Sequence, residues 1–280
     1  MLVLAAAIAL TQTQSVPELK IDKNRYPRVI GWAGEDRVLY RAAGTKPKTI
    51  DVYEVEVPSM KERLLHTLEE RNVPIGTMQD GSLLLSADYT LKSDGTQGGG
   101  RPYFDRCEGS TFIRVRWDYL TVAGELGTVV SQRVSEGFVA TATKQFAYVL
   151  DAKTRDNLAL STYGIYGRKL LRRVELRIGK DILRTPLSVR SVAALNDKQV
   201  AVLIVVGTRK ISEPHAMEPV TLAIFNPETG EGKAIWQTTW RIPEYPFDEP
   251  AATYVLASSP AGKRLAVMQE NVLRIIGIPD

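Results

Sequence analysis

The amino-acid sequence predicts an all-β fold of repeated four-stranded sheets, and three observations lead to this class. The stretch from Tyr254 to Met268 has two apolar runs around Pro260-Ala-Gly-Lys263, where proline presets one turn dihedral and glycine supplies a positive one. The 21 glycines and 15 prolines among the 280 residues fit a fold with many turns. The pattern of apolar run, polar turn and apolar strand recurs at roughly 40 to 50 residues, which is typical of radial or solenoid arrays; it is present at Trp32–Tyr40, Thr77–Leu85 and Val192–Val202.

Residues 1–14 have the features of a signal peptide. Leu2–Leu10 is an uninterrupted apolar run, and Ala7-Ile8-Ala9 offers small residues at the spacing of a cleavage site. The run is too short to cross a bilayer, which needs about 20 residues. No basic residue precedes it, so the alternatives are a true start that lies upstream, or a disordered or packed N-terminus. We expect export to the periplasm or the extracellular space, and one domain over residues 15–280 without a transmembrane span.

The first structural unit is expected between Val29 and Leu68, after a single extended segment at Glu18–Asp22. Its strands are predicted at Val29–Ala33, Val38–Ala42, Thr49–Val57 and Arg63–Leu68. The last strand has an alternative interpretation, because Ser59 and Glu62 form a helix capping box and Met60, Leu64 and Leu68 share a helical face. We predict a strand there because the repeat requires one.

The second unit is expected from Pro74 to Gln132 and contains a glycine-rich loop, Ser93–Gly100. Such a loop can bind phosphate when a helix follows it, often beginning with Lys-Ser or Lys-Thr. No such sequence follows here, so the loop is interpreted as a flexible connector. The strands of this unit are predicted at Pro74–Met78, Ser82–Asp88, Phe112–Tyr119 and Gly127–Gln132.

Three further units complete the expected array, and the last lacks one strand. The third has Phe138–Thr143, Phe146–Asp151, Leu158–Tyr163 and Leu171–Ile178; the fourth has Val189–Leu195, Val200–Val206, Val220–Phe225 and, after the turn Asn226–Gly230, Ala234–Gln237. The fifth has only Thr253–Ser258, Arg264–Gln269 and Val272–Ile278. A closed ring leaves no long exposed edges. We therefore expect Glu18–Asp22 to pair beside Val272–Ile278 as the missing strand.

The turn motifs resemble those of β-propellers of the WD-repeat-like kind, especially TolB-type repeats, whose blades carry a Ser-Pro-Asp-Gly-Lys turn. Ser259-Pro-Ala-Gly-Lys263 and Gln79-Asp-Gly-Ser82 are partial matches, with Ala261 in place of the usual Asp. Asn226-Pro-Glu-Thr-Gly230 is similar to the outer hairpin turn of such blades. The resemblance implies a β-propeller, and with the five units predicted above we expect five four-stranded blades closed by the N-terminal strand. It implies no activity, because propellers carry many unrelated functions.

Two function classes remain open, a binding protein and an enzyme. Glycoside hydrolysis generally needs two carboxylic acids facing each other across the substrate, yet none of the five expected innermost strands contains Asp or Glu. His66, His215 and Cys107 are too few for a typical zinc site, and no Gly-x-Ser-x-Gly motif is present. The sequence therefore predicts a non-enzymatic binding or scaffold protein without catalytic residues, metal or cofactor. A five-bladed glycosidase-like or other hydrolase acting at the channel face is the alternative.

Three long connections, at Tyr89–Ser110, Gly207–Pro219 and Thr239–Pro250, are candidate binding loops for a protein or carbohydrate partner. Loops on a rigid scaffold often carry function, and aromatic and Arg residues often form binding hot spots. The candidates are Tyr103, Phe104, Asp105, Arg106, His215, Trp240, Arg241, Tyr245 and Phe247. The alternative is structural, because the prolines of the last connection can stiffen it over packed rings.

One segment is strongly basic although the chain carries a net charge of only +4. Between Arg168 and Arg190 there are eight Lys or Arg residues against Glu175 and Asp181. Its expected outer strand places Arg173, Glu175 and Arg177 on one face. Charge on an outer strand can simply prevent edge pairing. The alternative is an anionic surface as partner, contacted by Arg172, Arg173 and Arg177; for an exported protein, acidic lipid or polysaccharide is expected before nucleic acid.

Overall fold

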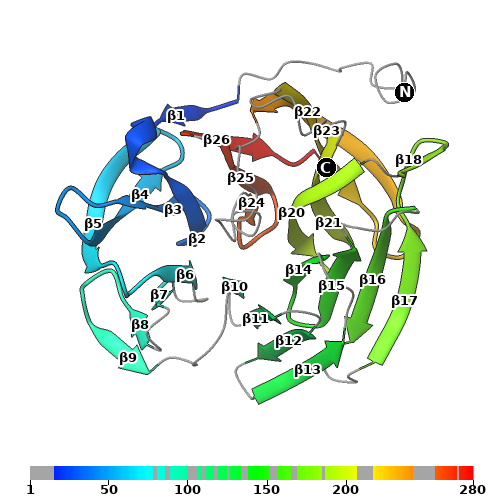
Figure 1. Cartoon of the computed structure of the whole chain (residues 1–280), viewed down its shortest axis with the longest axis horizontal. Helices are drawn as coiled ribbons and strands as arrows, with labels where there is room; N and C mark the ends of the chain where they lie inside the picture. The colour runs from blue at the N-terminus through cyan, green and yellow to red at the C-terminus, as the bar shows by residue number, and fades with distance from the viewer. Residues whose placement is uncertain are drawn as a thin grey trace.

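The computed structural model describes residues 16–77, 81–85, 89–99, 106–108, 111–116, 119–124, 127–133, 138–151, 157–164, 169–184, 187–206, 217–241, 256–269 and 271–279. Apart from the short 3-10 helix η1 (Lys23–Arg25), the regular structure of these residues is entirely β-strand. The strands form four-stranded antiparallel groups arranged around a common centre (Figure 1). The expected all-β, propeller-like fold is therefore confirmed. The signal-peptide-like residues 1–14 lie outside the described residues.

The first group contains β2 (Arg28–Trp32), β3 (Arg37–Ala43), β4 (Thr49–Glu56) and β5 (Lys61–Glu69), paired in this order. Strand β5 confirms the strand interpretation of this segment. The Ser59 hydroxyl accepts a hydrogen bond from the Lys61 N–H and donates one to Glu56. Ser59 thus closes the turn between β4 and β5 instead of capping a helix.

Residues 74–133 form two groups instead of the single expected unit. The first has β6 (Pro74–Thr77), β7 (Leu83–Leu85), β8 (Tyr89–Leu91) and β9 (Gln97–Gly99); the second has β10 (Arg106–Glu108), β11 (Thr111–Arg116), β12 (Tyr119–Gly124) and β13 (Gly127–Arg133). Parallel pairing of β6 with β10 joins them, with Cys107 opposite Gly76. The expected connector Ser93–Gly100 is a turn followed by β9, and the expected strand Phe112–Tyr119 spans β11 and the start of β12.

The next two groups contain β14 (Phe138–Ala142), β15 (Phe146–Asp151), β16 (Ala159–Gly164) and β17 (Lys169–Glu175), then β20 (Leu187–Asn196), β21 (Gln199–Val206), β22 (Met217–Phe225) and β23 (Glu231–Arg241). A short hairpin of β18 (Arg177–Ile178) and β19 (Asp181–Ile182) connects them. Strand β18 pairs in parallel with β23, so the expected outer strand Leu171–Ile178 is divided between two sheets. The division falls at Leu176, which is buried.

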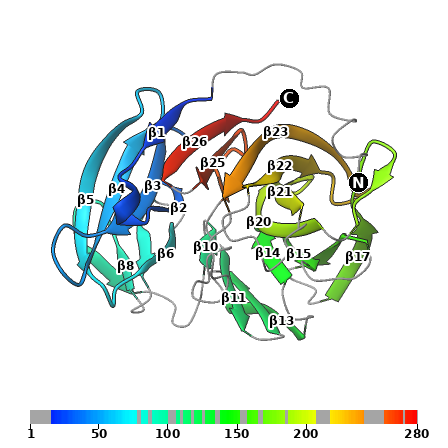
Figure 2. The same ribbon diagram turned by 45° about the horizontal axis from the view of Figure 1, so that its top comes forward.

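The last group confirms the expected pairing of the N-terminal strand beside Val272–Ile278. Strand β1 (Glu18–Lys20) pairs antiparallel with β26 (Val272–Gly277), which continues through β25 (Arg264–Gln269) to β24 (Leu256–Ser258). Both Figure 1 and Figure 2 show β1 beside β26. The expected turn at Pro260–Lys263 joins β24 to β25, and Gly262 has a φ of +70°. A side chain on Gly262 would overlap the backbone of Leu195 in the neighbouring group, so glycine is required here.

The hydrophobic core of the described residues lies between neighbouring groups. One cluster joins the β14–β17 group to β20–β22, and another joins the first group to β25 and β26. The innermost strands also bond to one another. The Trp32 indole N–H donates to the Ala257 carbonyl at 2.9 Å, and the Ala194 N–H donates to the Thr141 hydroxyl at 2.9 Å. The described strands thus form five hydrogen-bonded sheets, and the eight-stranded sheet of β6 to β13 contains two of the groups of four.

Candidate functional site

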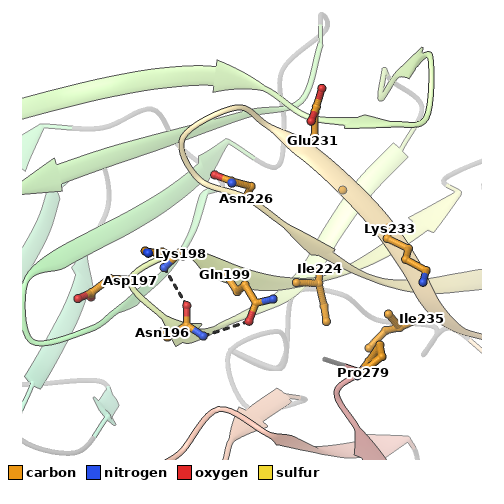
Figure 3. Close-up of a pocket in the computed structure, with 11 residues that line it drawn as sticks. Asn196, Asp197, Lys198, Gln199, Ile224, Asn226, Glu231, Lys233, Ile235 and Pro279 are labelled. Carbon is orange, nitrogen blue, oxygen red and sulfur yellow. Dashed lines mark hydrogen bonds between the residues drawn. The ribbon is translucent and has the colours of Figure 1, made fainter.

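A groove of about 780 Å³ lies at the edge of the β20–β23 group (Figure 3). The turn between β20 and β21 forms one end, and Ile224, Ile235 and Pro279 form an apolar floor toward the other (Figure 3). The turn between β22 and β23 lies above it. The lining residues are Asn196, Asp197, Lys198, Gln199, Ile224, Asn226, Glu231, Gly232, Lys233, Ile235 and Pro279.

Hydrogen bonds hold the two turns of this groove in fixed conformations. The Asn196 carboxamide accepts from the Lys198 N–H at 2.8 Å and donates to Gln199 at 3.0 Å. The Asn226 carboxamide accepts from the Glu228 N–H at 2.7 Å. Asparagine readily forms such bonds to its own backbone. The groove is therefore shaped before any partner arrives.

Asp197 belongs to the support of the groove. Its carboxylate accepts a hydrogen bond from the Thr143 hydroxyl, and its backbone carbonyl accepts one from the Tyr148 hydroxyl at 3.0 Å. Burial, together with the charges of Asp197 and Glu228, raises the pKa of Tyr148, so that this hydroxyl stays protonated and remains a donor. Lys198 and Lys233, by contrast, are exposed and have no ion pair in the part of the chain that the structure describes.

A basic surface adjoins the groove across β23. Strand β18 pairs with Glu231 and Gly232, two residues that also line the groove. The cations of β17, β18 and the residues that follow are all exposed, and we call them the basic strip: Lys169, Arg172, Arg173, Arg177, Lys180 and Arg184. Arg172 lies 3.8 Å from the Glu228 carboxylate, whereas the other five have no ion pair among the described residues. Arg173, Glu175 and Arg177 are exposed and Leu176 is buried, as expected, but Arg177 belongs to β18 and does not share a strand face with Arg173 and Glu175.

A smaller cavity of about 300 Å³ lies between the first two groups and contains the imidazole of His66. Its Nε2 atom is buried and has no hydrogen-bond partner. Burial lowers the pKa of His66 from its ordinary value of 6.5, while a hydrogen bond to the backbone of Lys92 acts in the opposite direction. The nearby Glu54 carboxylate is also buried and accepts from Arg63 at 2.8 Å and Arg37 at 3.3 Å.

Acidification should destabilise the wild-type protein more than a His66→Gln variant. Because the folded pKa of His66 lies below 6.5, the unfolded chain takes up a proton first as the pH falls. The stabilising contribution of neutral His66 is therefore complete above about pH 6.5 and decreases as the pH falls through the folded pKa. Urea unfolding at about pH 7.5 and pH 5 measures this difference. An equal loss of stability in both proteins would contradict the role of His66.

Most of the predicted loop residues cannot be compared with the structure. Tyr103, Phe104, Asp105, His215, Tyr245 and Phe247 lie outside the described residues. Three others lie in strands instead of loops: Arg106 begins β10, and Trp240 and Arg241 end β23. The expected connection Tyr89–Ser110 is not one continuous loop, because it contains the short strands β8, β9 and β10. The sequence predicted a loop here because consecutive glycines and polar residues are more typical of loops than of strands.

The structure also adds residues that the sequence interpretation missed. Strand β10 is an innermost strand and contains Glu108, so one acidic residue does lie in this layer. The groove residues Lys198 and Lys233 were not recognised either. The sequence does indicate the two polar turns that line the groove, Asn196–Gln199 and Asn226–Gly230. It does not indicate that they lie close together in the folded chain.

No family model matches the sequence, and no curated protein matches it. Solved structures similar to this chain include oligogalacturonate lyase in complex with manganese, at 9% identity, 95% coverage of this chain, 96% of that chain and a TM-score of 0.48. Drosophila Plexin A in complex with Semaphorin 1b matches at 8% identity, 96% and 88% coverage and a TM-score of 0.47. A protein of unknown function from Dyadobacter fermentans matches at 12% identity, 95% and 99% coverage and a TM-score of 0.53. At such identities the likeness concerns the fold alone.

Fold and site together define an all-β, propeller-like protein with a preformed groove beside a basic outer strand. Among the residues that the structure describes, no three His, Cys, Asp or Glu side chains gather as they would around a metal ion. Within the same residues, no helix has the length and apolar character needed to cross a bilayer.

Proposed function

We propose that this chain is a non-enzymatic binding or scaffold protein that holds an anionic partner at the basic strip and the adjoining groove. One observation carries the proposal: eight exposed cations lie in the basic strip and at Lys198 and Lys233 of the groove, and only Arg172 has an ion-pair partner among the described residues. Exposed cations that form no ion pair attract an anionic surface from a distance and remain available for contact.

Rigidity supports a binding function for this surface. The two groove turns are held by local hydrogen bonds, and the β18–β19 hairpin is fixed to the β20–β23 group by pairing with β23. A preformed surface loses little conformational freedom when a partner binds. Export of the chain, proposed from residues 1–14, would bring the surface to acidic polysaccharide, lipid or protein outside the cytoplasm.

Charge reversal in the basic strip should abolish salt-sensitive retention on heparin. We expect Arg173→Glu/Arg177→Glu to elute from a heparin column at much lower salt than the wild-type protein, because surface attraction is screened by salt. The matched control, Lys46→Glu/Lys61→Glu, makes the same charge change at exposed residues of the first group and should elute near the wild type. Equal elution of both variants would contradict a specific role of the strip.

The predicted loop residues remain a second proposed contact surface, which a pull-down of partners from native extract tests. If a variant with Ala at Tyr103, Arg106 and Tyr245 recovers the same partner as the wild-type protein, binding is assigned to the basic strip. If the folded variant no longer recovers that partner, binding is assigned to the loops. Their aromatic and Arg side chains support the proposal by chemistry alone.

A hydrolase acting at the channel face is the second candidate, favoured by Glu108 in the innermost strand β10. A glycosidase of the usual kind needs two acids, and no other innermost strand of the described residues contains Asp or Glu. Glycoside hydrolysis that Glu108→Gln abolishes would favour this candidate over the binding protein. If hydrolysis is unaffected by Glu108→Gln, Glu108 has no catalytic role.

A further inference from the structure

Strand β17 is an open sheet edge in the part of the chain that the structure describes. It pairs with β16 on one side, while the chain leaves the sheet at Leu176 and continues on β23. The Leu176 N–H donates to the Leu158 carbonyl, toward β16, at 2.9 Å. Because backbone groups alternate in direction along a strand, those of Arg173 and Glu175 point away from β16. The Glu175 carbonyl lies against Gly230 of the β22–β23 turn, so the open part of the edge ends at Arg173. An edge of this kind can accept another strand.

The side chains of β17 combine apolar and basic character. Leu170 is 45% exposed and Leu171 is 49% exposed, and both lie between the exposed cations Lys169 and Arg172. An edge that only prevents pairing needs charge but no exposed leucines. The apolar side chains are therefore better explained by contact with a partner.

The outer strand of the first group provides a comparison. Strand β5 also exposes a leucine, Leu64, but it carries charges of both signs, at Lys61, Glu62 and Arg63. Arg63 bonds to Glu54, and the Tyr40 hydroxyl donates to Glu62. Unlike β17, β5 presents no excess of unpaired positive charge.

We propose that β17 binds an extended acidic segment of a partner protein as an additional strand, an inference that rests on the proposed anion-binding function. The backbone of the segment would pair with the open edge, its carboxylates would contact Arg172 and Arg173, and its apolar side chains would cover Leu170 and Leu171. Addition of a strand to a sheet edge is a known mode of peptide recognition. The chain does the same internally, since β18 adds to the edge of β23.

A labelled synthetic peptide tests this inference with the intact protein. The probe is an acetylated peptide of alternating Glu and Val, matched to the 7 residues of β17, and binding is followed by fluorescence anisotropy. We expect the wild-type protein to bind it and to ignore a Lys-Val peptide. Methylation of alternate backbone nitrogens, which removes hydrogen-bond donors but keeps every charge, should weaken binding by roughly tenfold or more.

Two variants separate the contributions of charge and apolar contact. Arg172→Glu/Arg173→Glu should abolish binding of both the peptide and heparin. Leu170→Ser/Leu171→Ser should weaken peptide binding by roughly tenfold and leave heparin binding unchanged. Lys46→Glu/Lys61→Glu serves as the control and should change neither. Thermal unfolding confirms that each variant remains folded.

The alternative outcomes have distinct meanings. Equal affinity for the methylated and parent peptides would overturn strand addition while anion binding remains. Binding of heparin fragments or phosphatidylserine vesicles, without binding of the peptide, would assign the strip to polysaccharide or lipid and overturn the protein partner. Failure of heparin binding to respond to charge reversal would overturn the proposed function itself.

Discussion

Removal of residues 1–23 should lower the free energy of unfolding by about 3–6 kcal/mol, through lost apolar burial and lost strand pairing. The deletion removes β1 and Ile21, which is buried in the cluster between the first and last groups. The Ile21 N–H donates to the Asn271 carbonyl at 2.8 Å, and the Asn271 carboxamide donates to the Ile21 carbonyl at 2.7 Å. Without these contacts β26 becomes an open edge over an uncovered core.

Urea unfolding of two truncated proteins measures this effect. Deletion of residues 1–14 leaves β1 in place and should leave the midpoint unchanged. The point variant Ile21→Ala tests the same contact without altering chain length and should lower stability by about 2–5 kcal/mol. Equal midpoints for the two truncated proteins would show that β1 does not close the fold.

Replacement of Asp51 by Ala should destabilise the protein by about 3–5 kcal/mol, the usual effect of breaking a buried ion pair. Asp51 is fully buried, accepts a hydrogen bond from Thr67 at 2.7 Å and lies 3.7 Å from the Arg25 guanidinium. Arg25 lies over the Tyr53 ring, 4.5 Å from its centroid. Loss of the carboxylate leaves this mostly buried cation without compensation.

An exposed ion pair and a double variant provide the controls. Glu69→Ala breaks a pair with Arg71 at 2.6 Å in which both side chains are exposed, and it should change stability by less than about 1 kcal/mol. Asp51→Ala/Arg25→Met should recover part of the loss, because the uncompensated charge is gone. If the double variant is as unstable as Asp51→Ala alone, the loss comes from the other hydrogen bonds of Asp51.

The local sequence was sufficient to predict strands and turns, because these depend on neighbouring residues. The Pro260–Lys263 and Asn226–Gly230 turns lie where proline, asparagine and glycine indicated them, and Gly262 and Gly230 both have positive φ. The alternation around Leu176 correctly separated buried from exposed side chains. The basic strand was also visible, since its composition is local.

The number of groups could not be obtained in the same way. Residues 74–133 fold into two groups whose strands are short; β7, β8, β9 and β10 have three residues each. Three residues contain too little alternation to distinguish a strand from a loop. The parallel pairing of β6 with β10 was equally invisible, because neither strand encodes its partner.

By itself, the sequence determined an all-β chain, its principal hairpins, the strand that closes the last group and a basic outer strand. Tertiary structure alone decided that the chain leaves one sheet at Leu176 and joins β23, that Lys198 and Lys233 share a groove, and that Glu108 lies in an innermost strand. The physical reason is that strand formation follows local side-chain pattern, whereas any exposed edge offers the same backbone groups. The choice among edges therefore depends on packing between residues far apart in the chain.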